Sequence, residues 1–558
     1  MDRRVDEGGP PLRTWFRDRK AALALLGPAL VFFAVFLAYP LQGIVRESFA
    51  HGGGIEPLVE DAYFLERAWF TAWQATVSSV ITLALAIPVA YVLACYEFRG
   101  KAALEALITV PFVLPTIVVA VAFTALLGPR GIANDALQSV FGLEEPPIRL
   151  LNTIWAILIA HVFYNVALAA RIISVSWARV DTRLEDAAAM LGAGKVTTFV
   201  RVTLPLLRTP ILAAGSLVFL FCFTSFGVVL ILGGPEFGTI ETEIYRETLF
   251  LFRLPVAATL ALAQLAATFA MMWVNAALQR RTAQPGAMRR RTLAWTPARR
   301  VAVASIIAAV AGLTILPLAA LAERSIHGDG GYTLEYYRRL DDNVRQQILF
   351  VAPLTAVRNS VTFALLTMLI ALPLGTAAAH GATRMRSSLA EAVIQLPLGV
   401  SAVSLGLGFL ITLDRPPLDL RGSPAMVVIA HSLVALPFVA RTVAAQLRSL
   451  DPRLREAAAM LGATPVRTFI AIDLPLTWRS MLAGGVFAFA VSMGEFGATL
   501  LIARPEYPTI PLAVFRYLGQ PGALNYGQAL AMATILMAVT AAGFFIIDRL
   551  RYREFGGF

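Results

Sequence analysis

Long apolar stretches alternate with short polar segments along the whole chain. A helix needs about 20 residues to cross a hydrocarbon core of ~30 Å, and twelve of the stretches reach that length. The polar segments between them are too short to form a separate soluble domain. The pattern therefore predicts twelve membrane-spanning helices, at about residues 21–45, 68–96, 102–127, 150–178, 206–233, 254–279, 301–322, 354–380, 388–412, 424–447, 476–502 and 523–547.

The composition agrees with a membrane protein. Of the 558 residues, 58% are hydrophobic and 15% are charged, and the mean hydropathy is +0.69, which excludes an ordinary soluble domain. The cysteines, Cys95 and Cys222, both lie in apolar stretches, so they favour neither a disulfide framework nor a metal cluster. The basic N-terminal segment leads directly into a full-length span, which predicts an uncleaved first helix.

The distribution of charge assigns the two sides of the membrane. The proposed spans leave 32 Lys and Arg residues on one side and 15 on the other, whereas about 16 and 20 acidic residues lie on the same two sides. Arg-rich loops face the cytoplasm, so both termini are predicted to be cytoplasmic in a bacterial inner membrane. The net charge of +11 is therefore explained by topology, and no nucleic-acid partner is expected.

A repeat organises the chain. Residues Asp181–Gly227 and Asp451–Gly497 align without a gap at an offset of 270, and 22 of the 47 positions are identical. Because each half holds an even number of spans, the halves must have the same orientation. The fold class is thus predicted to be an all-α integral membrane protein of about 12 transmembrane helices in two parallel six-helix repeats.

This reading divides the chain into five parts. An Arg-rich linker carrying seven arginines and two prolines separates the halves, and each half contains one cytoplasmic loop from the repeat. The parts are a cytoplasmic tail at 1–20, a first transmembrane half at 21–279 with its loop at 179–205, a linker at 280–300, a second half at 301–548 with its loop at 449–475, and a cytoplasmic tail at 549–558.

Each repeated loop has the composition of a short helix followed by a turn into the next span. Alanines and leucines favour the helix, and acidic residues near its first turn suit the helix dipole. Gly192 and Gly462 are expected to end these helices, as glycine at the C′ position commonly does. Pro205 and Pro475 are expected in the first turn of the following span, where a missing N–H costs least.

The second loop resembles the EAA loop of the membrane subunits of binding-protein-dependent ABC importers, and the first loop fits with two mild departures, Asp186 for Glu and Val202 for Ile. In that family the loop is the coupling segment that docks into the ATPase subunit. The resemblance implies a type I importer fold, two separate ATP-binding ABC subunits and an extracytoplasmic substrate-binding protein. The residues that carry it are Asp186, Ala187, Ala188, Gly192, Leu204 and Pro205 in the first copy, and Glu456, Ala457, Ala458, Gly462, Leu474 and Pro475 in the second.

The chain lacks a nucleotide site of its own. Residues 189–196 approach the phosphate-binding P-loop pattern, but Ala189 and Val196 stand where that motif needs Gly and Ser or Thr. No nucleophile and base are paired in the sequence either. The chain is therefore expected to be a transport subunit and no enzyme, to bind no cofactor or metal itself, and to rely on partner subunits for ATP and Mg²⁺.

Polar residues inside the apolar stretches are candidates for function, because ionisable groups are costly in a bilayer. Glu495 is the clearest, and its counterpart in the first repeat is Ser225. Either the carboxylate lines a path for a cationic substrate, or it is hydrogen-bonded between helices. His161 and His431 occupy matching positions in the two halves, which indicates a shared packing or hydrogen-bonding role rather than a ligand role.

The whole chain resembles the fused, two-half permeases of ABC importers, which thiamine and ferric-iron systems use. Residues Phe223–Phe226, Leu232–Pro235 and Thr239–Glu241 look like thiamine permeases, whereas Gly494–Thr499 also looks like molybdate and sulfate permeases. The ferric-iron type usually carries a Lys-Glu-Leu-Pro-like sequence there, which this chain lacks. Thiamine is therefore the first expectation, ferric iron the second, and molybdate or sulfate the third.

A secondary transporter is the main alternative from another class, because some are built from two parallel six-span halves. Such a protein would be expected to have ion-coupling charges near the midplane and would not need duplicated coupling loops. A purely structural scaffold would not need these loops either. We therefore predict alternating access, in which ATP-driven closure of partner subunits moves both coupling helices.

Overall fold

The computed structural model describes residues 12–50, 54, 60–282, 295–328, 330–342, 351–385, 387–414, 416 and 418–555. Within these residues, eleven helices are long and apolar enough to cross a membrane, and a bent pair raises the number to twelve. This agrees with the twelve predicted spans. Most of the expected linker, residues 283–294, lies outside the described residues.

The first repeat is almost entirely helical. Its elements are α1 (Leu12–Phe33), a π-helical turn (Ala34–Ala38), α2 (Tyr39–Ser48), α4 (Ala62–Cys95), α5 (Lys101–Val113), α6 (Thr116–Leu127), α7 (Ile132–Phe141), α8 (Ile154–Trp177), α9 (Thr182–Met190), α10 (Lys195–Thr198), a π-helical turn (Phe199–Thr203), α11 (Leu204–Phe223), α12 (Gly227–Leu232), α13 (Ile240–Leu249) and α14 (Leu254–Thr282).

The second repeat follows the same plan and adds a small antiparallel strand pair. Its elements are α15 (Pro297–Ser325), β1 (His327–Gly328), β2 (Gly331–Tyr332), α16 (Glu335–Arg338), a 3-10 turn (Arg339–Asp341), α17 (Pro353–Met385), α18 (Ser388–Gln395), a 3-10 turn (Leu396–Gly399), α19 (Ala402–Thr412), α20 (Ala425–Ser449), α21 (Pro452–Met460), α22 (Pro465–Thr468), a π-helical turn (Phe469–Asp473), α23 (Leu474–Gly494), α24 (Gly497–Ile502), α25 (Ile510–Leu518) and α26 (Ala523–Phe555).

Four of the predicted spans are broken, which the apolar pattern alone did not reveal. The expected spans at 102–127 and 388–412 divide into α5 and α6 and into α18 and α19, the latter pair with a bend of 87°. Those at 206–233 and 476–502 divide into α11 and α12 and into α23 and α24. Every piece is apolar, so hydropathy continues smoothly across each break while the backbone does not.

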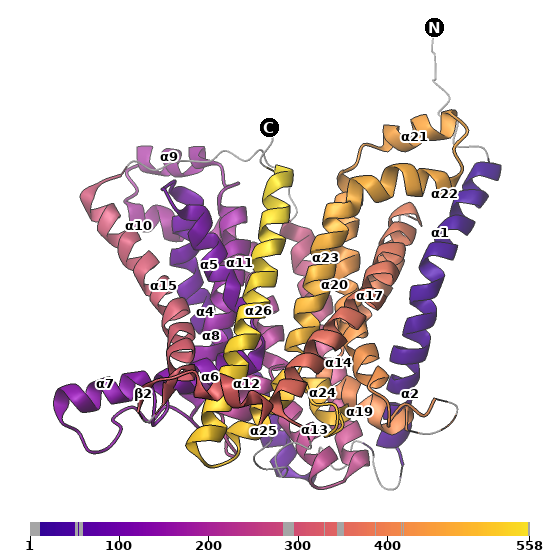
Figure 1. The fold of residues 1–558 in the computed structure, drawn as a ribbon. Helices are drawn as coiled ribbons and strands as arrows, with labels where there is room; N and C mark the ends of the chain where they lie inside the picture. Colours follow the sequence, from indigo (N-terminus) through magenta and orange to yellow (C-terminus); the bar gives the residue numbers. More distant parts are fainter. Residues whose placement is uncertain are drawn as a thin grey trace.

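The first span of each repeat packs against the opposite repeat. Helix α1 contacts α17, and α15 contacts α6 and α5. In Figure 1 the indigo α1 accordingly stands among the orange helices of the second repeat, and α15 among the purple helices of the first. The two repeats are therefore intertwined, and neither buries its core without the other.

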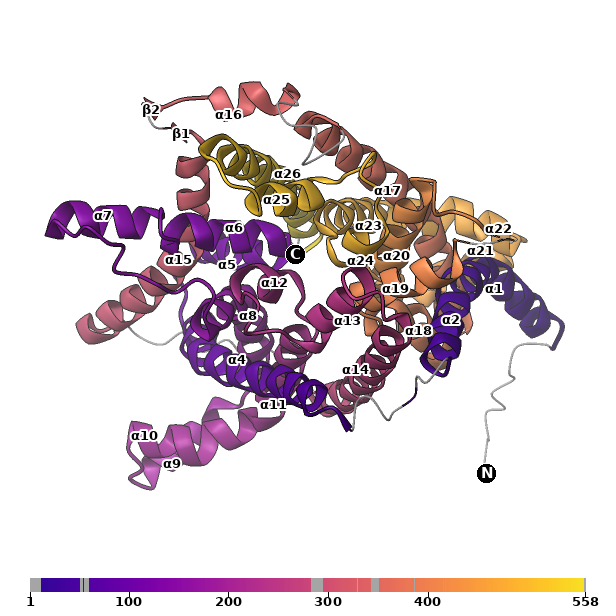
Figure 2. The ribbon, with the colours of Figure 1, turned by 90° about the horizontal axis from the view of Figure 1, so that it is seen from below.

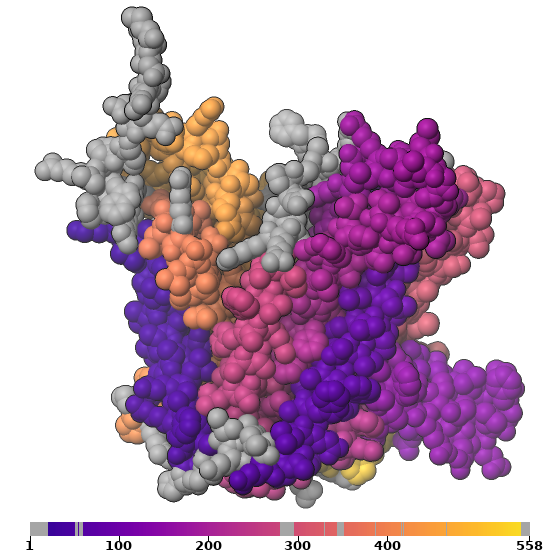
Figure 3. Space-filling view, turned by 180° about the vertical axis from the view of Figure 1, so that it is seen from behind, coloured from indigo at the N-terminus to yellow at the C-terminus, as the bar shows by residue number. Residues whose placement is uncertain are grey.

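The two ends of the molecule carry different sets of short helices. The helices of the repeated loops, α9 and α21, lie at one end, together with the start of α1 and the last turns of α26 (Figure 1). Helices α12, α13, α24 and α25 gather at the opposite end, and Figure 2 shows them near the middle of that face. Figure 3 shows a hollow in the surface between the orange helices of the second repeat and the pink and magenta helices of the first. The hollow lies toward the end that carries α9 and α21.

Candidate functional site

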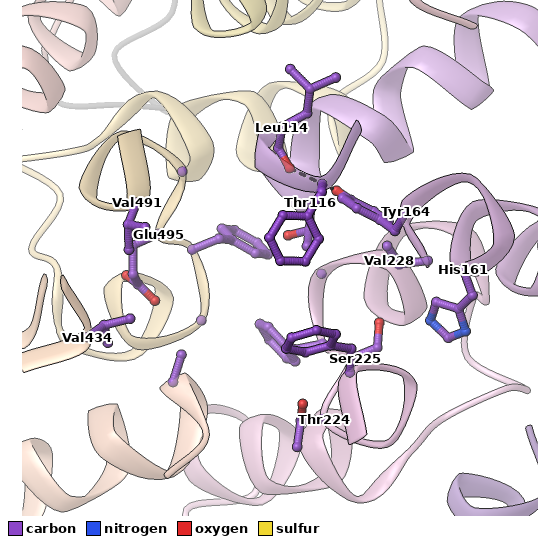
Figure 4. Close-up of a pocket in the computed structure, with 18 of the residues that line it drawn as sticks. Leu114, Thr116, His161, Tyr164, Thr224, Ser225, Val228, Val434, Val491 and Glu495 are labelled. Carbon is purple, nitrogen blue, oxygen red and sulfur yellow. Dashed lines mark hydrogen bonds between the residues drawn. The ribbon is translucent and has the colours of Figure 1, made fainter. Parts of the chain in front are cut away.

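The breaks in the four divided spans meet around one cavity of about 360 Å³. Both repeats contribute to its wall, and most of the wall is apolar (Figure 4). Backbone that is not helical at membrane depth is tolerated only where it is buried in protein or lines a cavity, which accounts for the position of the breaks. The lining residues are Phe112, Leu114, Thr116, His161, Tyr164, Asn165, Phe221, Thr224, Ser225, Phe226, Gly227, Val228, Ala402, Val434, Val491, Gly494, Glu495, Phe496 and Gly497.

Local sequence explains one of the breaks, and a close contact between the repeats lies at another. Pro115 disfavours a helical conformation at Leu114, whose backbone is extended at the end of α5. The freed Leu114 carbonyl accepts a hydrogen bond from the Tyr164 hydroxyl at 3.2 Å (Figure 4). Gly494 ends α23 beside this turn, where an added Cβ would lie 2.9 Å from Pro115 Cγ. The repeats therefore interlock at their breaks.

Glu495 holds the N-terminus of α24. Its Oε1 accepts from the backbone N–H of Ala498 at 2.8 Å, and its Oε2 accepts from that of Thr499 at 3.0 Å and from the Thr499 hydroxyl. His431 Nε2 lies 3.2 Å from the same Oε2. The side chain lines the cavity but is only 7% exposed. Of the two roles that the sequence left open for Glu495, the structure shows the hydrogen-bonded carboxylate. The side chain nevertheless borders the cavity.

The matching position in the first repeat is built differently. Ser225 replaces the carboxylate at the end of α11 and also lines the cavity. His161, the counterpart of His431, places Nδ1 2.9 Å from Ser78 Oγ. Its Nε2 is buried, and no described residue offers it a hydrogen-bond partner. An unpaired buried polar atom costs about 1–3 kcal/mol, so this nitrogen is a marked feature of the cavity wall.

Aromatic rings close the cavity on the side away from the coupling helices. Phe226 and Phe496 line it from α11–α12 and α23–α24, and their centroids are 5.7 Å apart. Tyr245 of α13 packs edge-on against Phe226 at 5.7 Å, and Phe515 of α25 packs likewise against Phe496 at 5.5 Å. Phe112 and Phe221 form a further ring pair in the wall.

The helices α9 and α21 end at the glycines that the sequence predicts, and each also begins with an aspartate cap. Asp181 and Asp451 cap α9 and α21 by accepting hydrogen bonds from backbone N–H groups two residues later, each at 3.0 Å. Gly192 and Gly462 follow the helices with φ of +83° and +80°. Ala193 donates its N–H to the carbonyl of Ala188, and the second copy repeats this bond, which completes a Schellman motif in each loop.

The following spans begin earlier than the sequence indicates. Pro205 and Pro475 do lie in the first turn of α11 and α23, but those helices continue from π-helical turns at Phe199–Thr203 and Phe469–Asp473. One continuous helix therefore runs from Lys195 to Phe223 in the first repeat. A π-helical turn before a proline accommodates the missing N–H, so the proline does not require a free helix end.

Both coupling helices expose apolar side chains. No residue of α9 or α21 is buried in the described chain. Met190 and Leu191 are each 89% exposed, as are Met460 and Leu461. Exposed apolar groups repeated at matching positions of two loops are typical of a protein interaction surface.

Side-chain links attach each coupling helix to the span behind it, with different chemistry in the two repeats. In the first, the Thr203 hydroxyl donates to Glu185 at 2.7 Å. In the second, the matching pair is Arg455 and Asp473, whose closest atoms are 2.8 Å apart, and Arg384 adds a second contact to Asp473 at 3.2 Å. These contacts join α9 to the start of α11 and α21 to the start of α23.

The structure collects the sequence-predicted residues into three places. Those of the first loop lie around α9 and those of the second around α21, at the same end of the molecule (Figure 1). Ser225 and Glu495 line the one cavity described above. Sequence reasoning missed the rings of Phe226, Phe496, Tyr164 and Phe112, although the repeated Phe-Gly after position 225 and position 495 was an available signal.

A family model covers much of the chain. Residues 86–284 and 371–554 each match the binding-protein-dependent transport system inner membrane component. The chain belongs to this family. It is accordingly a multi-pass membrane permease subunit of an ABC importer and no enzyme, and the predicted fold class of two parallel six-helix repeats is confirmed by the two matches and the helices.

Individual relatives span different shares of this permease. It is 28% identical to the thiamine transport system permease protein of Brucella abortus (strain 2308) over 532 residues, which cover 94% of each chain. It is 26% identical to the protein of the same description from Escherichia coli (strain K12), over 89% of this chain and 90% of that one. The molybdenum transport system permease protein of Haemophilus influenzae is 33% identical over 33% of this chain and 89% of its own length.

Proposed function

We propose that this permease carries thiamine across the bacterial inner membrane. The observation that carries the proposal is the similarity to thiamine permeases of Brucella abortus and Escherichia coli over about nine-tenths of the chain, through both repeats. The similarity to the molybdenum permease covers only 33% of the chain, which is less than one of its two transmembrane halves. A fused pair of repeats is thus a property that this chain shares with the thiamine permeases.

The cavity suits the chemistry of thiamine, which joins an aminopyrimidine ring to a positively charged thiazolium ring. Aromatic faces attract cations, and heteroaromatic rings stack on them. Phe112, Tyr164, Phe221, Phe226 and Phe496 supply such faces. A volume of about 360 Å³ lies at the small end of the ~300–1,000 Å³ usual for ligand pockets, as a vitamin-sized solute requires.

Ser225 and Glu495 are proposed to border the substrate path. Each oxygen of the Glu495 carboxylate already accepts hydrogen bonds from the chain, so we assign it an electrostatic role rather than direct coordination. Its negative charge, buried beside an apolar cavity, makes the path favourable for a cation and unfavourable for an oxyanion.

The partners follow from the coupling helices. We propose that α9 and α21 each dock on one ATP-binding subunit through their exposed ends, including Met190 and Met460. A substrate-binding protein would deliver thiamine at the opposite end, near α13 and α25. We propose that both termini lie in the cytoplasm, and the surplus of basic residues on that side supports this orientation.

The mechanism we propose is alternating access. The hollow between the helix groups opens toward the coupling helices (Figure 3), and the four rings of Phe226, Phe496, Tyr245 and Phe515 close the other side. In the membrane orientation that we propose, this conformation is inward-facing. Closure of the ATPase subunits would push α9 and α21 together. The contacts Glu185–Thr203 and Arg455–Asp473 would pass this movement to α11 and α23, which would rotate and separate the four aromatic rings.

Ferric iron is the second candidate substrate, and the cavity does not favour it. A hard cation prefers several oxygen ligands. Among the residues that the structure describes, no group of three His, Cys, Asp or Glu side chains could hold a metal ion.

The test is to purify the tagged permease from membranes with its partner subunits and to titrate the co-purified binding protein with thiamine by calorimetry. We expect micromolar or tighter binding, and ATP-dependent uptake of labelled thiamine by proteoliposomes that contain the whole complex. Binding of ferric iron or molybdate without thiamine would overturn the substrate assignment. Uptake driven by a proton gradient without ATP would overturn the importer class.

A further inference from the structure

The two repeats keep one histidine but change every group around its Nε2. In the second repeat, His431 Nε2 lies 2.8 Å from Thr499 Oγ1 and 3.2 Å from Glu495 Oε2. At an offset of 270 residues, Thr499 corresponds to Val229 and Glu495 to Ser225. Neither replacement supplies a partner for His161 Nε2.

The same changes place His161, and not His431, on the cavity wall. A valine has no polar atom, and a serine is too short to reproduce the reach of a glutamate. The space that the carboxylate fills in the second repeat is therefore part of the cavity in the first. Figure 4 shows the result: Glu495 lies on one side of the cavity, and Ser225 and His161 lie on the other.

His161 is built into this position. The side chain is 2% exposed, and its Nδ1 is 2.9 Å from the hydroxyl of Ser78, a residue that does not line the cavity. The nitrogen without a partner is thus the one on the opposite edge of the ring. A buried donor or acceptor with no partner in the protein favours a bound group that completes the hydrogen bond.

We propose that His161 Nε2 hydrogen-bonds to a polar heteroatom of the substrate's aromatic heterocycle and so determines specificity. The inference rests on the proposed function, because it assumes that the cavity holds the transported solute. In this proposal the heterocycle of the substrate lies between the ring faces of Tyr164 and Phe226, and His161 Nε2 contacts the polar edge of that heterocycle. For thiamine, that edge is the aminopyrimidine, whose ring nitrogens and amino group complement an imidazole nitrogen in either tautomer.

A matched pair of substitutions separates the two edges of the imidazole. His161→Gln places an amide nitrogen near the position of Nε2, whereas His161→Asn places one near Nδ1 and keeps only the contact to Ser78. A third variant, Ser225→Glu, gives His161 the partner that His431 has in the second repeat. The control is His431→Asn, which perturbs the matching histidine on the side where it does not line the cavity.

The experiment measures ATP-dependent uptake by the full complex in proteoliposomes, with thiamine and with oxythiamine, in which a carbonyl replaces the pyrimidine amino group. We expect kcat/KM for thiamine to fall about tenfold or more in His161→Asn and Ser225→Glu, because one buried hydrogen bond is lost. His161→Gln should retain most of the activity. The preference of the wild type for thiamine over oxythiamine should collapse in His161→Asn and persist in His431→Asn.

The outcomes separate the two proposals. If the wild type does not transport thiamine, the proposed substrate fails, and this role for His161 fails with it. If the wild type transports thiamine, but His161→Asn and Ser225→Glu keep its kcat/KM and its preference over oxythiamine, the inference alone is overturned. A Ser225→Glu complex that loses uptake and also melts at a higher temperature would support the inference in two ways. The new carboxylate would form the missing hydrogen bond with His161 Nε2, and it would occupy the space that the substrate needs.

Discussion

Phe226 and Phe496 occupy matching positions of the two repeats and stack on each other, with ring centroids 5.7 Å apart and planes inclined by 28°. Equivalent positions of the two repeats therefore meet directly at this contact. Each ring is supported by an edge-on partner from the short helix that follows, Tyr245 or Phe515. We propose that this contact, to which each repeat contributes one ring, separates when the halves move apart and so acts as the outer gate.

The first prediction concerns this gate. Phe226→Ala and Phe496→Ala each remove the same stacked contact, which is worth about 0.5–1.5 kcal/mol beyond area burial. We expect either variant to favour the outward-open state and so to raise the basal ATPase rate of the complex without binding protein. The double variant should cost less stability than the sum of the single ones, as a double-mutant cycle of thermal unfolding would measure. Phe141→Ala, at an exposed ring, is the control. Additive effects with an unchanged basal ATPase rate would contradict the gate.

The second prediction concerns the turn after the coupling helix. Gly462 has φ of +80°, a conformation that costs a residue with a side chain about 1–2 kcal/mol, and no atom lies within 4 Å of an added Cβ. Gly462→Leu should therefore distort the end of α21 without a clash inside the spans. We expect uptake to fall about tenfold or more while ATP hydrolysis continues and the melting temperature changes little.

Gly194 provides the matched control for that variant. It lies in the equivalent loop of the first repeat, also with no atom within 4 Å of an added Cβ, but its φ is −68°. Gly194→Leu should retain coupled transport. Normal uptake and normal substrate-stimulated ATP hydrolysis in Gly462→Leu would show that this turn does not take part in coupling.

The number of spans and the repeat were predictable because hydropathy and the 270-residue offset report them directly. The caps of α9 and α21 were predictable for a similar reason, since Asp181 and Gly192 act through local backbone geometry. The break at Leu114 follows from Pro115, whereas the break at Glu495 was not predictable, because it lies inside an apolar stretch and depends on packing across the repeats. His161 Nε2 has no partner because Ser225 and Val229 stand where the second repeat has Glu495 and Thr499. Only the assembled fold brings these two positions next to the histidine.

The third prediction concerns the charge at the cavity. Glu495→Gln keeps the size of the side chain but removes the charge and one acceptor, while hydrogen bonds to charged groups contribute about 1.5–3 kcal/mol. We expect a lower melting temperature, because α24 and His431 lose part of their pairing, and a higher KM for thiamine with kcat less affected. The exposed carboxylate of Glu506 supplies the control, Glu506→Gln. An unchanged KM for Glu495→Gln would remove this residue from the substrate path.

The fourth prediction exploits the different links behind the two coupling helices. Asp473 is fully buried and contacts Arg455 and Arg384, so replacing it removes the buried carboxylate from both ion pairs. Breaking a buried ion pair costs about 3–5 kcal/mol, whereas losing a single hydrogen bond costs about 1 kcal/mol. Because both arginines are partly exposed, we expect Asp473→Thr to cost about 3 kcal/mol and Thr203→Val about 1 kcal/mol in the free energy of unfolding.

A transplanted pair tests whether these links carry motion as well as stability. Arg455→Glu combined with Asp473→Thr rebuilds in the second repeat the Glu185–Thr203 pair of the first. The combination should recover part of the stability and of the coupled uptake that Asp473→Thr alone loses, although the contact of Arg384 with residue 473 is not rebuilt. Measurement of uptake per ATP hydrolysed decides the point, because a merely structural link would restore the melting temperature without restoring that ratio. A double variant worse than Asp473→Thr in both readouts would show that the two links are not equivalent.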